Sequence, residues 1–277
     1  MRRIVQQTLT PQLAAWLPNF PYQQLASWVA YCDEEVVGVA VTGSNCMHPI
    51  NRYVELVIAP NYRRQGWGTR LFQAIVAATA QPLQWSGDET ACDALVFVEK
   101  VGFQLKRRCW EYEVETDSLA SRWQEETSLP LCSVDKLNST QLQQLQKQVV
   151  AHYRTVHHAV NPLTMALSLA EIYQCLTTAM TPAWSFCLLD SCGDVSCWVL
   201  VESDGSEAFV TYVGRHKTAD WTVYEGFLAQ VLRRLAQQFE RLSFEVDDVD
   251  EEAMCLQRLL SVELPAAYCN YVYTQEK

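Results

Sequence analysis

The stretch Ile58-Ala59-Pro60-Asn61-Tyr62-Arg63-Arg64-Gln65-Gly66-Trp67-Gly68-Thr69-Arg70-Leu71 decides the fold of this chain. The run before it, 53–58, is dense in β-branched and large apolar residues and predicts a buried strand that ends at Pro60. From Leu71 onward, apolar residues recur at spacings of three and four, which predicts an amphipathic helix opening near Gly68. The order is therefore strand, glycine-containing turn, helix.

A turn of this kind suits an anion. The first turn of a helix leaves backbone N–H groups without intrahelical partners and carries the positive end of the helix dipole. Gly66 and Gly68 have no Cβ, so a phosphate can approach the main chain, and Arg63 and Arg64 add cationic side chains. The simplest ligand is a pyrophosphate, and an ordinary glycine turn is the alternative on spacing alone.

These residues resemble the signature of the GNAT family, the GCN5-related N-acetyltransferases, which is R/Q-x-x-G-x-G/A after a strand end V-x-P. Here Ile58-x-Pro60 is followed by Arg63-x-x-Gly66-x-Gly68. A second segment, residues 94–103 (ALVFVEKVGF), resembles the family's A-x-x-F-Y-E-K-x-G-F. The resemblance covers residues 1–115 well. It implies an α/β (α+β) fold in which a mixed, mostly antiparallel sheet is flanked by helices.

The resemblance also implies an acetyl-CoA site. The pantetheine arm would pair along the predicted strand near its end, and the pyrophosphate would lie on the glycine-containing loop and the first helical turn. The residues implied as cofactor-binding are Val57, Ile58, Arg63, Arg64, Gln65, Gly66, Trp67, Gly68 and Thr69.

Acetyl transfer to an amine needs a base for the amine, a polarised thioester carbonyl and a proton for the leaving thiolate. The family's usual tyrosine falls on Val98 and its frequent asparagine on Ala91, so acid catalysis needs another residue. Glu55 is the candidate base, and Tyr112 or Tyr53 is the candidate acid. The alternatives are a solvent-facing Glu55 and tyrosines that belong to the core.

The segment ahead of the first strands carries short apolar patterns broken by prolines, which predict short helices joined by turns. In the GNAT family this region covers the acceptor pocket. Its aromatic residues are candidates for lining the pocket, although the core is the more common place for such side chains. They are Trp16, Phe20, Tyr22 and Trp28. His48, in a polar loop, is expected to be solvated.

Length and composition predict a folded two-domain protein of 277 residues, 49% of them hydrophobic. No run of 18 apolar residues occurs and the start lacks a signal-peptide core, so we expect neither a membrane span nor export. The 11 cysteines form no C-x-x-C pair and no zinc spacing. They predict reduced thiols in a cytoplasmic protein without disulfides or a metal site.

The second half repeats the order of elements of the first, with a shift of 159 positions that places 85–88 on 244–247. We therefore expect two GNAT-like domains in tandem. The predicted parts are an N-terminal domain at 1–116, a polar linker at 117–130 and a C-terminal domain at 131–277. Strands at 103–105 and 108–115 are expected to finish the N-terminal domain.

The chemistry of the turn is not repeated. The shift takes Gly66 to Glu225 and Gly68 to Phe227. Where a pyrophosphate would lie, the glutamate predicts charge repulsion and the phenylalanine predicts steric blockage. The C-terminal domain is therefore expected to be degenerate, without a working CoA site.

The resemblance implies an acetyl-CoA-dependent N-acetyltransferase in which a primary amine of a small molecule or peptide attacks the thioester directly. The alternative is a non-catalytic CoA-binding pseudoenzyme, a sensor or scaffold, because Val98 has replaced the family's acid. The formal net charge of −11 disfavours nucleic acid as a partner and tolerates a cationic amine. Neither the acceptor nor the oligomeric state can be read from the sequence.

Overall fold

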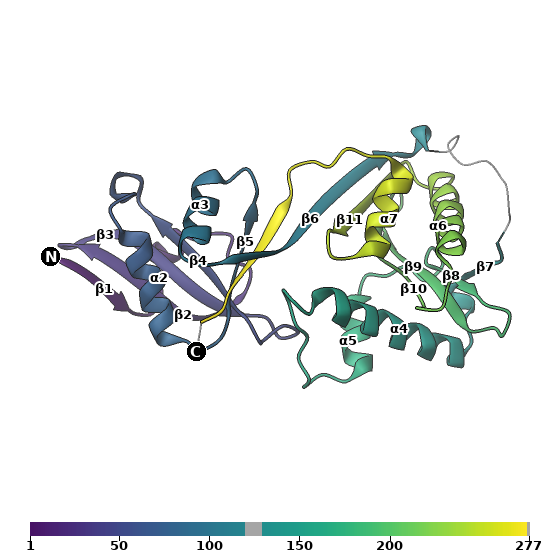
Figure 1. Ribbon diagram of the computed structural model, residues 1–277, viewed down its shortest axis with the longest axis horizontal. Helices are drawn as coiled ribbons and strands as arrows, with labels where there is room; N and C mark the ends of the chain where they lie inside the picture. The colour runs from purple at the N-terminus through teal and green to yellow at the C-terminus, as the bar shows by residue number, and fades with distance from the viewer. Residues whose placement is uncertain (120–128, 276–277) are drawn as a thin grey trace. The chain divides into compact units, whose positions relative to one another are not determined.

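The computed structural model of the chain describes residues 1–119 and 129–275 (Figure 1). The chain divides into two compact units that do not follow the linear order of the sequence. The first unit contains Met1–Lys106, His157–Thr164 and Cys269–Lys277, and the second contains Arg107–Val156 and Met165–Tyr268.

The first unit is a mixed sheet in which neighbouring strands follow the order β1-β2-β3-β4-β5-β12. The first four strands pair antiparallel, and β4 and β5 pair parallel. The strands are β1 (Arg2–Gln6), β2 (Gln23–Cys32), β3 (Glu35–Ser44), β4 (Arg52–Ile58), β5 (Leu83–Asp88) and β12 (Tyr268–Tyr273). The helices are α1 (Pro11–Ala14), α2 (Trp67–Ala78) and α3 (Cys92–Lys100).

The two faces of this sheet carry different partners. On one face α2 packs against β1 to β4, where Leu71 is fully buried and lies with Ile58 beside Gly38. On the other face, α1 contributes Leu13 to a core cluster that includes Val41. Because side chains alternate along a strand, odd-numbered residues of β4 share the α1 face. This alternation decides which β4 side chains can meet a substrate.

The second unit repeats this plan with the order β6-β11-β10-β9-β8-β7, in which only β10 and β11 pair parallel in the described registers. Its strands are β6 (Gln104–Glu115, which begins in the first unit), β7 (Leu131–Ser133), β8 (Phe186–Leu189), β9 (Val195–Ser203), β10 (Glu207–Arg215) and β11 (Arg241–Asp247). Its helices are α4 (Ser139–His157), α5 (Leu169–Leu176), α6 (Trp221–Ala236) and α7 (Glu251–Leu260). Helices α6 and α7 pack side by side (Figure 1).

The predicted internal repeat is confirmed at the level of elements. The shift of 159 positions carries Cys92, the first residue of α3, onto Glu251, the first residue of α7. It also carries Asp88, the last residue of β5, onto Asp247, the last residue of β11. Each unit therefore contains the sequence strand, helix, strand, helix in the order expected for a GNAT-type domain.

The units exchange their last strands, which differs from the expected boundaries at 116 and 131. Strands expected at 103–105 and 108–115 form one continuous strand, β6, whose residues from Arg107 onward belong to the second unit and pair with β11. The first unit is completed by β12, which lies beside β5 although it comes from the end of the described chain. Local sequence pattern predicts a strand but not its partner, because pairing is decided by long-range packing.

The expected linker at 117–130 falls largely on 120–128, outside the described residues; before it, Thr116–Ser118 forms a single 3-10 turn. Within the described ranges, no helix has both the length and the apolar character needed to cross a membrane.

Candidate active site

Strands β4 and β5 separate soon after they start. Their described register ends at the pair Tyr53 and Gln84, whereas β3 accompanies β4 as far as Ile58. In the described registers, residues 54–58 of β4 therefore have a strand on one side only. An extended ligand can hydrogen-bond to the main chain along such an open edge, as peptides do when they add to a sheet.

The loop after β4 turns the chain directly into α2. Arg64 and Gly66 have positive φ angles of 59° and 83°, and Gly66 is the N-cap of α2. No side chain of the described residues caps the helix at Gly66, and a Cβ added there would meet nothing within 4 Å. The first-turn N–H groups of α2 are thus accessible to an anion.

The polar side chains of the loop are exposed, and two of them stabilise its main chain. Arg63 donates from Nε to the carbonyl oxygen of Ile58 at 3.2 Å. Gln65 donates from Nε2 to the carbonyl oxygen of Asn61 at 3.0 Å. These contacts indicate that Arg63 and Gln65 shape the loop through the main chain.

Arg64 presents an exposed guanidinium on the same loop. Its Nη2 atom lies 3.8 Å from Asp93 Oδ1, and both side chains are more than three-quarters exposed. This ion pair therefore contributes little to stability and can open. By contrast, the Trp67 ring is buried, with Arg2 and Arg70 guanidinium groups each 5.2 Å from its centroid. Trp67 can therefore contribute to a ligand site only through its backbone.

Gly68 has a packing role that its spacing did not reveal. A Cβ on Gly68 would lie 3.1 and 3.3 Å from ring atoms of Phe97 on α3. The close approach of α2 to α3 thus depends on a glycine at this position. The two segments that resemble the GNAT signature touch each other here.

A pocket of about 410 Å³ opens beside the end of β4, a volume within the usual range for small-molecule sites. It brings together three of the predicted cofactor residues, Val57, Ile58 and Arg63. Trp16, an aromatic candidate from the sequence, lines it from the segment that follows α1. The full lining is Gln12, Ala15, Trp16, Val57, Ile58, Ala59, Pro60 and Arg63.

The other aromatic candidates divide between site and core. Tyr22 stacks on Tyr53 of β4 with ring centroids 3.7 Å apart, and Phe20 meets Tyr22 edge-on at 5.5 Å. Trp28 is buried in the core. His48, expected to be solvated, is also buried, with its ring 6.5 Å from that of His157, because residues 157–164 belong to the first unit.

Glu55 lies on the α1 face of β4, the face that also carries Tyr53 and Val57. Its cross-strand partner is the buried Val41, and burial raises the pKa of the Glu55 carboxyl. A carboxyl whose pKa is raised binds a proton more readily near neutral pH, which is the property required of a general base.

A group of buried amides beside β5 was missed from the sequence. Gln84 is the parallel partner of Tyr53 and therefore faces the same side of the sheet. Ser86 Oγ donates to Asn270 Oδ1 at 2.8 Å, and Asn270 is only 3% exposed. Within the described part of the chain, Asn270 Nδ2 has no hydrogen-bond partner. An asparagine inside an apolar strand was a usable signal, but residues 269–277 were assigned to the other domain.

Tyr112, the candidate acid, belongs to the second unit and not to the unit that holds the loop. It is buried and stacks on Phe244 with ring centroids 5.0 Å apart, and burial raises the pKa of its hydroxyl. Val98, at the family's tyrosine position, is buried in the first unit. The first unit thus brings together Glu55 and the loop without Tyr112.

The corresponding helix start in the second unit is already capped by a side chain. Asp220 caps α6 by accepting hydrogen bonds from the N–H groups of Thr222 and Val223 at 2.8 and 3.4 Å. Phe227, expected to block a pyrophosphate, is instead fully buried, and Glu225 is exposed. A carboxylate at the helix start therefore takes the place that an anion would need.

Comparisons with known proteins agree with this geometry. Residues 23–105 match the family model for an acetyltransferase (GNAT) domain. No curated protein sequence matches the chain. Among solved structures, a GCN5-related N-acetyltransferase from Sphaerobacter thermophilus is similar with a TM-score of 0.57 and 12% identity, covering 95% of this chain and 84% of that one.

Two further structures are similar over 99% of this chain. A tandem GNAT protein from the clavulanic acid biosynthesis pathway has a TM-score of 0.51 and 12% identity, with 98% of that protein covered. A glucosamine N-acetyltransferase region of a fungal multi-domain β-N-acetylglucosaminidase has a TM-score of 0.53 and 11% identity, with 38% of that chain covered.

The split strands and the open helix start lie within residues 23–105, the part of the chain that matches the acetyltransferase (GNAT) domain model. Residues 23–105 thus carry a GNAT-type domain, as the sequence resemblance implied, and the fold of the chain is similar to those of a GCN5-related N-acetyltransferase and a tandem GNAT protein.

Proposed function

We propose that this protein is an acetyl-CoA-dependent N-acetyltransferase whose first unit transfers an acetyl group to a primary amine of a small molecule or peptide. One observation carries the proposal. The open edge of β4 leads straight into an uncapped helix start at Gly66, so one continuous surface offers hydrogen bonds for an extended arm and N–H groups for an anion. Acetyl-CoA has both parts in that order.

The residues of the first unit fit this ligand. The main chain near Val57 and Ile58 would accompany the pantetheine arm, and the N–H groups from Gln65 to Thr69 would hold the pyrophosphate. Arg64, whose only described ion pair is exposed, adds a cation. The uncapped N-cap supports this role, because it leaves the helix start without an internal acceptor.

Glu55 is proposed as the base. It accepts a proton from the attacking amine, directly or through water, and its raised pKa favours that transfer near neutral pH. An N–H group on the open edge of β4 would polarise the thioester carbonyl. The leaving thiolate can take its proton from water or from Tyr53, which belongs to the same unit. The bound acetyl-CoA supplies the activated acyl group.

The second candidate is a CoA-binding protein without turnover, used as a sensor or scaffold. The observation that favours it is Val98, which is buried and has no proton to donate at the family's tyrosine position. Both candidates need the same loop, so binding alone does not separate them. Multiple-turnover acetylation of an amine panel does.

The decisive experiment is a calorimetric titration of the full chain with acetyl-CoA and with CoA, beside the variant Gly66→Glu. We expect micromolar binding by the unaltered protein and loss of binding in Gly66→Glu, because a carboxylate then lies at the helix start where the pyrophosphate is held.

Gly193→Glu provides a matched control. Gly193 has the same φ of 83° and, like Gly66, no atom within 4 Å of an added Cβ, but it lies in a turn of the second unit. Backbone strain from the substitution is therefore similar in both variants. Equal loss of binding in both variants, or no binding by the unaltered protein at millimolar ligand, contradicts the proposal.

A further inference from the structure

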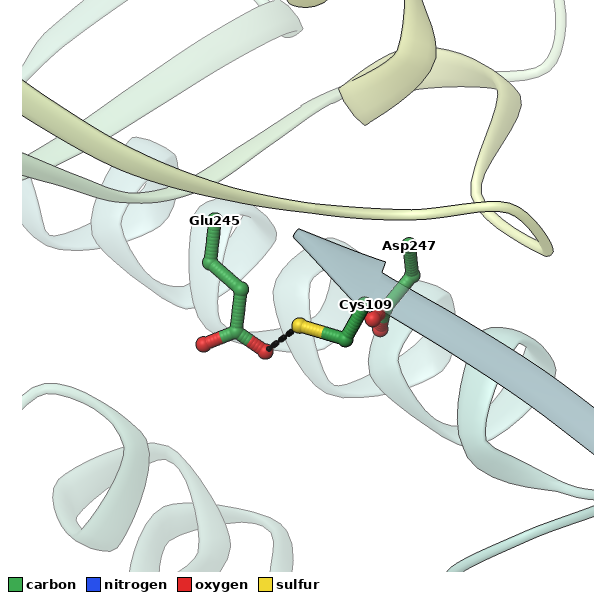
Figure 2. A group of neighbouring side chains, drawn as sticks. All are labelled: Cys109, Glu245 and Asp247. Carbon is green, nitrogen blue, oxygen red and sulfur yellow. Dashed lines mark hydrogen bonds between the residues drawn. The ribbon is translucent and has the colours of Figure 1, made fainter. Parts of the chain in front are cut away.

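One thiol and two carboxylates converge where β11 passes beside β6 in the second unit (Figure 2). Asp247 is the cross-strand partner of Cys109, and Glu245 lies two residues earlier on the same face of β11. The Cys109 thiol donates to Glu245 Oε1 at 2.8 Å. One ligand atom from each residue lies within 4.8 Å of the other two.

This group lies at the second unit's counterpart of the split between β4 and β5. The register of β10 with β11 ends at the pair Val210 and Phe244, so Glu245 and Asp247 come just after the point where the described pairing stops. The second unit thus keeps the split of the sheet while its helix start is closed by Asp220. Glu245 and Asp247 lie on β11, the strand that separates from β10 at this split.

The group carries more negative charge than its surroundings balance. Arg107 donates from Nη1 to Asp247 Oδ2 at 2.9 Å, and both side chains are only 10% exposed. Asp247 Oδ1 is buried and has no hydrogen-bond partner within the described ranges.

We infer that Cys109, Glu245 and Asp247 form a binding site for a divalent transition-metal ion of borderline softness, with Zn²⁺ as the representative ion. Thiolate and carboxylate ligands suit such an ion, and three protein ligands leave the fourth tetrahedral position for water or another small ligand. This site is separate from the acetyl-CoA site proposed for the first unit.

The geometry and charge fit this ion. Tetrahedral zinc with bonds of about 2.3 Å to sulfur and about 2.0 Å to oxygen places sulfur and oxygen ligands about 3.5 Å apart. The Cys109–Glu245 hydrogen bond of 2.8 Å would lengthen as the ion displaces the thiol proton to solvent. The thiolate, two carboxylates and Arg107 then sum to minus two, which the ion neutralises. Exposed Glu245 leaves a path from solvent.

A second group of potential ligands in the same unit is already satisfied internally. His152 Nε2 lies 3.0 Å from Asp250 Oδ2, and the other oxygen of Asp250 caps α7 through the N–H of Ala253 at 3.0 Å. Arg215 lies 3.3 Å from Glu252. These partners would have to be lost before an ion could bind there, so the cysteine-containing group is the stronger site.

The test is a titration of the reduced, full-length protein with Co²⁺, whose bonds to thiolate give a charge-transfer absorption band. We expect the band to saturate at one ion per chain and to be displaced by Zn²⁺. A hundredfold excess of Zn²⁺ over its dissociation constant should raise the thermal midpoint by about 5 °C.

Cys109→Ser and Glu245→Gln should each abolish the saturable band and the thermal shift. Cys192→Ser, which removes an exposed thiol of the same unit, should leave both unchanged. Because Glu245 is exposed, Glu245→Gln keeps the test valid if Cys109→Ser does not fold. A missing band in the unaltered protein, or a saturable band that persists in either ligand variant, overturns the inference. None of these readouts depends on acetyl transfer.

Discussion

Glu55, the proposed base, lies in an environment that is unfavourable for a charged carboxylate. It lies on the same face of β4 as the pocket residue Val57, and burial raises its pKa. The raised folded-state pKa means that the native protein binds the proton more tightly than the unfolded chain does. The stability contributed by protonated Glu55 is therefore present at low pH and lost as the pH rises through the folded pKa. A neutral amide in place of Glu55 removes the free-energy cost of holding a partly buried charge.

The first prediction separates the proposed catalytic role of Glu55 from its effect on stability. Glu55→Gln should lower kcat by about a hundredfold or more, with the dissociation constant for acetyl-CoA unchanged, because a general base typically contributes factors of this size. The rate of the unaltered enzyme should fall as the pH drops through the raised pKa, and this acid limb should be absent in Glu55→Gln. The measurement is the pH profile of kcat for an acetylated amine.

Stability supplies the control for Glu55→Gln. We expect the variant to be at least as stable as the unaltered protein at neutral pH, because it removes a partly buried charge. A fall in kcat accompanied by a clear loss of stability would mean that Glu55 is structural. An unchanged kcat would assign the base to another residue.

At the scale of elements, the loop depends on how α2 meets α3. Gly68 on α2 and Phe97 on α3 come from the two segments that resemble the GNAT signature, and they are in contact. The start of α2 therefore combines two features: Gly66 leaves the proposed anion site uncapped, and Gly68 lets the helix approach its neighbour. Spacing alone gave both glycines the same role.

The second prediction is a thermodynamic coupling between Gly68 and Phe97. Gly68→Ala places a methyl group 3.1 Å from the Phe97 ring, which opposes the gain in helix propensity of about 1 kcal/mol. In a Phe97→Leu background the clash is relieved, so Gly68→Ala should be more favourable there by about 1 kcal/mol. Urea unfolding of the four proteins in this cycle measures the coupling. Strict additivity would show that the contact has no energetic consequence.

The elements themselves were predictable where the pattern was local. The strand before Pro60, the turn and α2 follow from apolar periodicity and a glycine, and the capping of α6 by Asp220 is visible in retrospect as an aspartate ahead of an apolar run. Val57 and Ile58, expected from the sequence to bind the cofactor, line the pocket beside β4, and their role in binding stays a prediction. Tyr112 was placed with the first domain because a strand's partner depends on contacts that sequence periodicity does not encode.

At the scale of the whole chain, the exchange of strands joins distant parts of the sequence. β12 lies beside β5, although about 180 residues separate them, and its Asn270 accepts from Ser86 at 2.8 Å. Residues 157–164 also belong to the first unit, and Val160 accepts a hydrogen bond from Asn51 at 2.5 Å. The unit that holds the proposed acetyl-CoA site therefore depends on three separate segments of the chain.

The third prediction tests this dependence. Val272→Pro removes a main-chain donor and adds a rigid ring in the buried part of β12, and should destabilise the first unit by about 3 kcal/mol or more. Hydrogen exchange should quicken in β5, and acetyl-CoA affinity should fall. Glu263→Pro, in the exposed segment before β12, is the control and should change neither property. Unchanged exchange in β5 would show that β12 does not support it.

The exchange also determines when the proposed enzyme can become active during its synthesis. The loop at 63–69 leaves the ribosome early. On its other side from β4, β5 lacks a neighbouring strand until β12 has been translated, long after the strands of the second unit. Nascent chains and products truncated ahead of β12 carry the complete loop beside an unpaired β5 edge. Such fragments are candidates for chaperone capture and degradation. The proposed acetyl-CoA site is therefore complete only after β12, one of the last strands to be made, has been translated.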